Sequence, residues 1–177
     1  MSTHIDRPGP DEYAPYYEKY VGRVTSDDVV RTLGAQIETT LAFLQVVSTE
    51  DSLRRYAPGK WSVREVIGHM IDTERIFAYR ALRFARNDRT ELPGFEQDDY
   101  IPSAHFDERP WHDLLAELEF VRGANILMFR GLDAAAWLRR GVASGNEMSV
   151  RALAYSIAGH ELHHMEILRT RYLALTV

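Results

Sequence analysis

Two histidines stand four residues apart near the end of the chain, in the run His160-Glu161-Leu162-His163-His164. Four residues of an α-helix turn through about 400°, so His160 and His164 lie about 40° apart and can bind one ion together. Apolar residues recur along the same arc, which predicts that both imidazoles point into the protein interior. His163 lies about 100° from His164 and is the weakest ligand candidate of the three.

A metal site needs at least one further ligand, because zinc-like ions usually take three or more from the protein. His69 is the best candidate, since it lies at the margin of an apolar stripe in another predicted helix. The alternative for an inward-facing histidine is a hydrogen-bonded core residue. The chain has no cysteine, so only nitrogen and oxygen ligands are available. These residues favour one divalent transition metal per chain, with zinc, nickel and iron all compatible.

The same segment fits the zincin metalloprotease motif, in which the glutamate, here Glu161, is the general base. The context disagrees with that motif. The metzincin extension would require glycine at Ile167 and histidine at Thr170, and neither is present. A peptidase is therefore the least favoured interpretation. Glu161 remains a catalytic candidate, and the alternative is a salt bridge to an arginine of another helix.

Three residues that follow His69 are candidates for shaping a pocket. Asp72 lies one turn away and could orient a ligand imidazole from behind. Thr73 and Arg80 share the His69 face of the predicted helix. Arg80 is about 16 Å from His69 along the axis, too far to touch the metal. It would meet either an anionic part of a larger substrate or a carboxylate in an interhelical ion pair.

Helical periodicity and capping signals define the elements that must position these side chains. A capping box formed by Ser62 and Glu65 opens the second of them. No strand alternation is evident, and a long loop over residues 87–106 and a polar connection over residues 133–147 join the helices. Four helices are predicted, at about 26–47, 62–86, 110–131 and 149–174. They indicate an all-α protein built as a four-helix bundle.

Length and composition fit one domain of ordinary size, with an extended N-terminal arm over residues 1–25 and the bundle over residues 26–177. The chain has 177 residues, 45% of them hydrophobic, and a net charge of −5. No basic footprint for nucleic acid is present, and no apolar run is long enough to span a membrane. Without a signal-like N-terminus, we expect a cytoplasmic protein.

Four segments of the chain resemble the DinB superfamily, and in particular its YfiT-like members. They are residues 60–74, which lead into and past His69, residues 92–95 and 98–100 of the long loop, and residues 158–164 around the histidine pair. The resemblance covers roughly residues 25–175. It implies a bundle with a long crossover rather than a simple up-and-down ring. It also implies a metal held by His69, His160 and His164, and a homodimer.

The resemblance implies more than one activity. Some members are thiol S-transferases or thiol-dependent isomerases, others are described as metal-dependent hydrolases, and several are linked to stress responses. A divalent ion on neutral imidazoles lowers the pKa of a bound thiol or water, which makes a nucleophile at neutral pH. We therefore expect an enzyme acting on a small-molecule substrate, with a low-molecular-weight thiol as one such molecule. The alternative is a non-catalytic metal-binding protein of the stress response.

Overall fold

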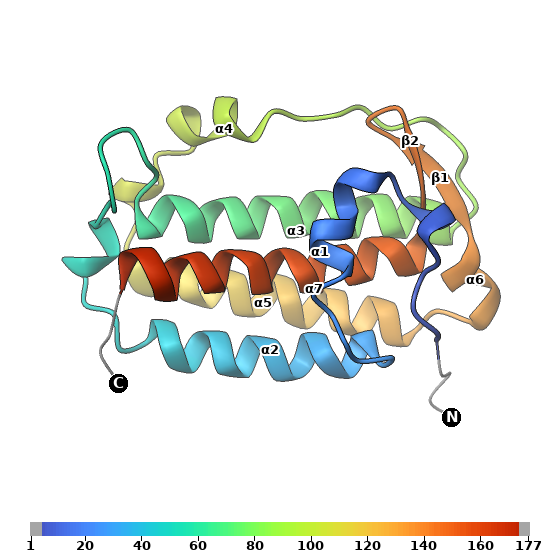
Figure 1. The fold of residues 1–177 in the computed structure, drawn as a ribbon, viewed down its shortest axis with the longest axis horizontal. Coiled ribbons are helices and arrows are strands. Elements are labelled where there is room, and N and C mark those ends of the chain that lie inside the picture. Colours follow the sequence, from blue (N-terminus) through green and yellow to red (C-terminus); the bar gives the residue numbers. More distant parts are fainter. Residues whose placement is uncertain (1–4, 174–177) are drawn as a thin grey trace.

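The computed structural model describes residues 5–173 of the chain, and four long helices form its body (Figure 1). Helices α2 and α7 run in one direction, and α3 and α5 run in the other. Around the bundle the neighbours are α2 with α5, α5 with α3, α3 with α7 and α7 with α2. The bounds are Val29–Leu44 for α2, Val63–Ala85 for α3, Trp111–Arg130 for α5 and Val150–Ile167 for α7.

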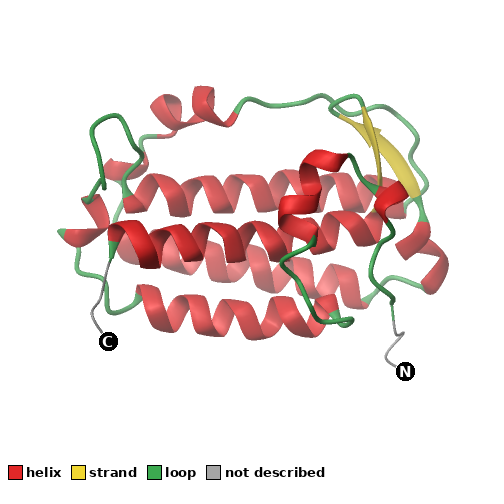
Figure 2. Cartoon of the chain, viewed as in Figure 1, coloured by secondary structure: helices red, strands yellow, loops and turns green. Residues whose placement is uncertain are grey.

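This order confirms the predicted bundle with a long crossover. Helices α3 and α5 follow one another among the long helices yet lie side by side and parallel, so the chain must return along the whole length of the bundle between them. Residues 86–110 make that return (Figure 2). The crossover leaves α3 directly beside α7, which is the pair of helices that carries the three histidines.

Local capping explains where the long helices begin. The Ser62 hydroxyl accepts a hydrogen bond from the backbone N–H of Glu65, and the Glu65 carboxylate accepts one from Ser62, so the predicted capping box is present. At the starts of α2 and α7, the side chains of Asp28 and Ser149 each accept one hydrogen bond from a backbone N–H of the first turn. Helix α7 continues as a π-helical turn, Leu168–Tyr172, and the predicted end near residue 174 lies outside the described residues.

The long loop predicted over residues 87–106 is only partly a loop. It contains helix α4 (Gln97–Ala104), followed by a one-turn 3-10 helix, Phe106–Glu108. The polar start of α4 and Pro102 inside it hid this helix from the periodicity analysis. Gly68 lets the Phe106 ring pack directly on α3, since a Cβ there would lie 2.4 Å from the ring.

The prediction that the polar connection over residues 133–147 contains no strands is wrong. It holds the short helix α6 (Ala134–Leu138) and a two-stranded antiparallel hairpin of β1 (Arg140–Ala143) and β2 (Asn146–Ser149). The hairpin turns at Ser144 and Gly145, both with positive φ. Strands of four residues are too short for alternation to be recognised. The crossover pairs with the hairpin through Leu92, whose N–H donates to Val142.

The segment before α2 lies against the bundle. The prediction of an extended arm is wrong over residues 10–21, which form two one-turn 3-10 helices, Pro10–Glu12 and Pro15–Tyr17, and helix α1 (Glu18–Val21). Figure 1 shows α1 crossing α7 near its middle. Among the described residues, no helix combines the length and apolar content that crossing a membrane would take.

Candidate metal centre

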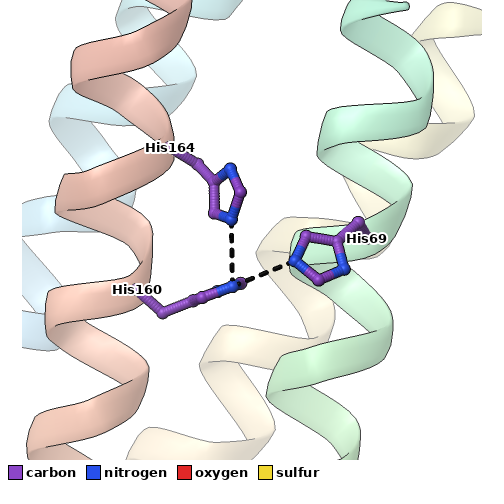
Figure 3. Close-up of side chains that lie close together, drawn as sticks. All are labelled: His69, His160 and His164. Carbon is purple, nitrogen blue, oxygen red and sulfur yellow. Dashed lines mark hydrogen bonds between the residues drawn. The ribbon is translucent and has the colours of Figure 1, made fainter. Parts of the chain in front are cut away.

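Three imidazoles converge between α3 and α7, as Figure 3 shows. The Nε2 atoms of His69 and His164 each lie 3.0 Å from Nε2 of His160. One ligand atom from each histidine can be chosen so that all three lie within 4.8 Å of one another. The structure thus brings together the three residues that the sequence singled out, although 91 residues separate His69 from His160.

Burial keeps these imidazoles neutral. His69 and His160 are buried, and His164 is partly buried. Burial lowers the pKa of His69 to about 4. It also holds the pKa values of His160 and His164 well below their usual range, and the neighbouring imidazoles add to the effect. A histidine binds a metal ion only through an unprotonated nitrogen, so the cluster is already in the protonation state that a ligand needs.

Hydrogen bonding alone does not account for three nitrogens that meet at one point. A neutral imidazole nitrogen either donates or accepts, yet Nε2 of His160 faces two other ring nitrogens at the same distance. Two imidazoles on one tetrahedral ion, each 2.0–2.1 Å from it, have nitrogens about 3.3 Å apart. The observed 3.0 Å spacing is close to that value. The donor set therefore fits a divalent metal ion.

Aromatic rings hold two of the imidazoles in place. The Trp61 ring centroid lies 5.0 Å from that of His69, and the Tyr20 ring meets His160 edge-on at 5.2 Å. The Thr73 hydroxyl lies 3.4 Å from Nδ1 of His69. Thr73 was predicted as a pocket residue and Tyr20 was not, since nothing in the sequence of the N-terminal segment indicates which helix it covers.

Gly159 explains how Tyr20 reaches the site. A Cβ on Gly159 would lie 2.0 Å from the Tyr20 carbonyl oxygen, so only glycine allows the backbone of α1 to cross α7 at this point. The crossing sets the Tyr20 ring against both His160 and His163. His163 is not a member of the cluster, although its ring centroid lies 5.1 Å from that of His164.

Glu161 lies in a buried ion-pair network on the far side of His160. Nη2 of Arg122 is 2.6 Å from Oε2 of Glu161, in an ion pair without hydrogen-bond geometry. The Thr40 hydroxyl donates to Oε1 at 2.5 Å, and Arg122 also donates two hydrogen bonds of 2.8 Å to Glu74. Burial opposes the charge of Arg122, but the two carboxylates outweigh it and raise its pKa. The salt-bridge alternative for Glu161 is therefore the arrangement that the structure adopts.

The remaining sequence candidates fall in different places. Asp72 is partly buried and makes no hydrogen bond to His69 in the described part of the chain, and its charged neighbours are Arg75, Arg109 and Glu117. Burial raises the pKa of its carboxyl. Arg80, by contrast, shares a pocket of about 290 Å³ with Thr73 and His160. The structure thus places Thr73 beside the cluster and Arg80 in a pocket next to it, and it leaves Asp72 outside both.

Comparisons with known proteins agree with this picture. The family model of the DinB superfamily matches residues 32–168. The fold is similar to that of YfiT from Bacillus subtilis, described as "a probable metal-dependent hydrolase with an unusual four-helix bundle topology". The TM-score is 0.65 at 16% identity, and the alignment covers 93% of each chain. No curated protein sequence matches this chain at a significant level.

A second solved structure has a comparable fold. It is a mycothiol-dependent maleylpyruvate isomerase, with a TM-score of 0.66 at 11% identity. The alignment covers 82% of the present chain but only 61% of the isomerase, so the isomerase contains a substantial part that has no counterpart here. At these identities the two structures establish the fold alone.

Proposed function

The chain belongs to the DinB superfamily, and from that premise we propose that it is a metal-dependent enzyme acting on small molecules, with a thiol or water as the activated nucleophile. His69, His160 and His164 would hold one divalent ion. The observation that carries the proposal is the convergence of three neutral, largely buried ring nitrogens on one point. A divalent ion bound there lowers the pKa of a coordinated thiol or water and supplies a nucleophile near neutral pH.

The ligand count supports an open site. Catalytic zinc sites keep a position for water or substrate, whereas structural sites are closed by a fourth protein ligand. Within residues 5–173 the cluster has three members. The closest carboxylate in sequence, Glu161, is committed to Arg122 and Thr40, and the chain has no cysteine. An external ligand would therefore complete the coordination.

The surrounding residues prepare the site for a ligand. Trp61 and Tyr20 fix two imidazole planes, so little ordering remains to be done when an ion binds. The pocket beside His160 has aromatic walls from Tyr17, Tyr20 and Phe77. Polar and charged side chains make up most of the remaining lining, and groups of this kind fix the orientation of a small organic ligand. The likeness to a mycothiol-dependent isomerase supports a thiol as one such ligand.

Two alternatives make different predictions. A non-catalytic metal-binding protein would need a closed coordination shell, which the three-membered cluster does not favour. A zincin-type peptidase would need Glu161 free to act as a base, and that side chain is buried in an ion pair.

Cobalt substitution tests the proposal. Thiolate bound to cobalt(II) gives charge-transfer absorbance in the near ultraviolet. The cobalt protein should gain such a band with small thiols and not with matched alcohols, and binding should strengthen as pH rises toward neutrality because a proton is released. The His164→Ala variant should give no band. A wild-type cobalt protein whose spectrum is unchanged by every thiol would contradict thiol binding at an open position.

A further inference from the structure

Arg80 is a buried guanidinium without a carboxylate partner. Its side chain is 2% exposed, and it forms no ion pair with any residue in the described range 5–173. The other fully buried arginine of the bundle, Arg122, lies between two glutamates. A buried charge is costly unless it is paired, so Arg80 needs an explanation that Arg122 does not.

The immediate surroundings hold the guanidinium in one orientation. Nη2 donates hydrogen bonds of 3.0 Å to the Pro93 carbonyl oxygen and to the Ser144 hydroxyl. The Phe77 and Phe95 ring centroids each lie 5.8 Å from Cζ. Both of these bonds come from one nitrogen, whereas a guanidinium carries five N–H donors. The group is therefore positioned by its neighbours with donors left for a further partner. Burial lowers the pKa of Arg80, and Tyr17 acts in the opposite direction.

Ser144 is an unusual residue for the place that it occupies. It is the first residue of the hairpin turn and has φ of 53°, a conformation in which glycine, asparagine or aspartate is preferred. Its side chain makes the contact to Arg80. A strained residue that also orients a buried charge is typical of a ligand site, where the surrounding structure maintains the strain.

The guanidinium shares a pocket with one member of the histidine cluster, His160. Arg80 and His160 both line the cavity of about 290 Å³. The Phe77 ring bridges them, since its centroid lies 5.8 Å from Cζ of Arg80 and 6.4 Å from that of the His160 ring. A molecule that fills the cavity can therefore contact Arg80 at one end while its other end reaches His160.

We propose that Arg80 binds the carboxylate of a small organic acid whose body lies along Phe77 and whose reacting end faces His160. The position of the reacting end rests on the proposed function, whereas the carboxylate site does not. A guanidinium fork matches a carboxylate in two parallel hydrogen bonds. Glu96 and Asp98 also line the pocket, and both are exposed. Their charges disfavour a multiply charged anion, so the ligand is a monocarboxylate rather than a phosphate ester.

Calorimetry with matched probes tests the carboxylate site. Arylalkanoates with one to four methylene groups are titrated into the protein, alongside the corresponding amides and phenyl phosphate. The wild type should bind the best carboxylate at least about tenfold more tightly than its amide, since a charge-assisted hydrogen bond contributes this much. Equal binding of acid and amide, no binding of any acid, or tighter binding of the phosphate would each overturn the proposal.

Two variants test whether Arg80 causes the preference for the acid over the amide. Arg80→Gln should abolish the preference for the acid. Arg75→Gln should retain it, because Arg75 is an exposed arginine of the same helix and does not line this pocket. Circular dichroism confirms folding, and if Arg80→Gln does not fold, Ser144→Ala should reduce the preference by freeing the guanidinium. A preference unchanged in either folded variant would contradict the assignment.

Repeating the titrations after chelation separates this inference from the proposed function. The carboxylate preference should persist in metal-free protein, since Arg80 and not the ion provides the contact. A persistent preference together with a cobalt protein that ignores thiols would leave the carboxylate site standing and refute the thiol chemistry. The reverse pair of results would refute the carboxylate site alone.

Discussion

Nη2 of Arg122 lies 2.6 Å from Oε2 of Glu161, so the glutamate of the apparent zincin motif is held in a buried ion pair inside the bundle. The guanidinium comes from α5 and also bonds Glu74 of α3, while Thr40 of α2 donates to Glu161 of α7. One network thus joins all four long helices next to the histidine cluster. We expect this network to help hold the four helices together beside the point where His69 meets His160.

Replacing Arg122, the centre of this network, should lower the free energy of unfolding. In Arg122→Met two buried carboxylates lose their counter-charge, and breaking a buried pair in this way costs about 3–5 kcal/mol. We expect a loss of that order in the free energy of unfolding, measured by urea denaturation. Arg75→Met is the matched control, since it breaks an exposed pair with Glu117 that is worth about 0–1 kcal/mol. Equal losses in the two variants would contradict the structural role of Arg122.

The crossing of α1 over α7 should depend on Gly159. In Gly159→Ala the new methyl group would collide with the Tyr20 carbonyl, and such overpacking typically costs about 1–3 kcal/mol. We expect lower stability and faster proteolysis in the N-terminal segment. Gly34→Ala serves as the control, because nothing lies within 4 Å of a Cβ there, and alanine should stabilise α2 by up to about 1 kcal/mol. Unchanged proteolysis in Gly159→Ala would show that α1 does not require this contact.

Acid should destabilise the metal-free protein through His69. Its pKa is about 4 in the folded protein against 6.5 for an unperturbed histidine. Between these values the unfolded chain takes up a proton that the folded protein does not, so stability is full above pH 6.5 and falls as the pH drops toward 4. Burial lowers the pKa values of His160 and His164 as well, so His69→Gln should reduce the slope of a stability–pH curve measured by thermal unfolding without removing it. An identical slope in the variant would mean that another group causes the loss.

Features of the fold and the site could be predicted from the sequence wherever the interacting residues lie in one helix. The capping box at Ser62, the helical spacing of His160 and His164 and the apolar stripe around His69 are all patterns within one helix. Contacts between segments that are distant in the sequence could not be predicted in this way. Tyr20 over Gly159, and Ser144 beside Arg80, depend on where a distant segment passes, which no periodicity encodes. The short hairpin and α4 were missed because each is too brief to show its period. The homodimer, the cytoplasmic location and the stress response stay predictions.

The metal content of purified protein tests the central claim most directly. Elemental analysis should find one divalent transition metal per chain in the wild type and in His163→Ala, whose altered side chain lies outside the cluster. His164→Ala should have lost it while its helical circular dichroism is retained, because no other described residue of the chain joins the cluster as a replacement ligand. Full metal content in folded His164→Ala, or equal loss in His163→Ala, would contradict the assignment of His69, His160 and His164 as the metal site.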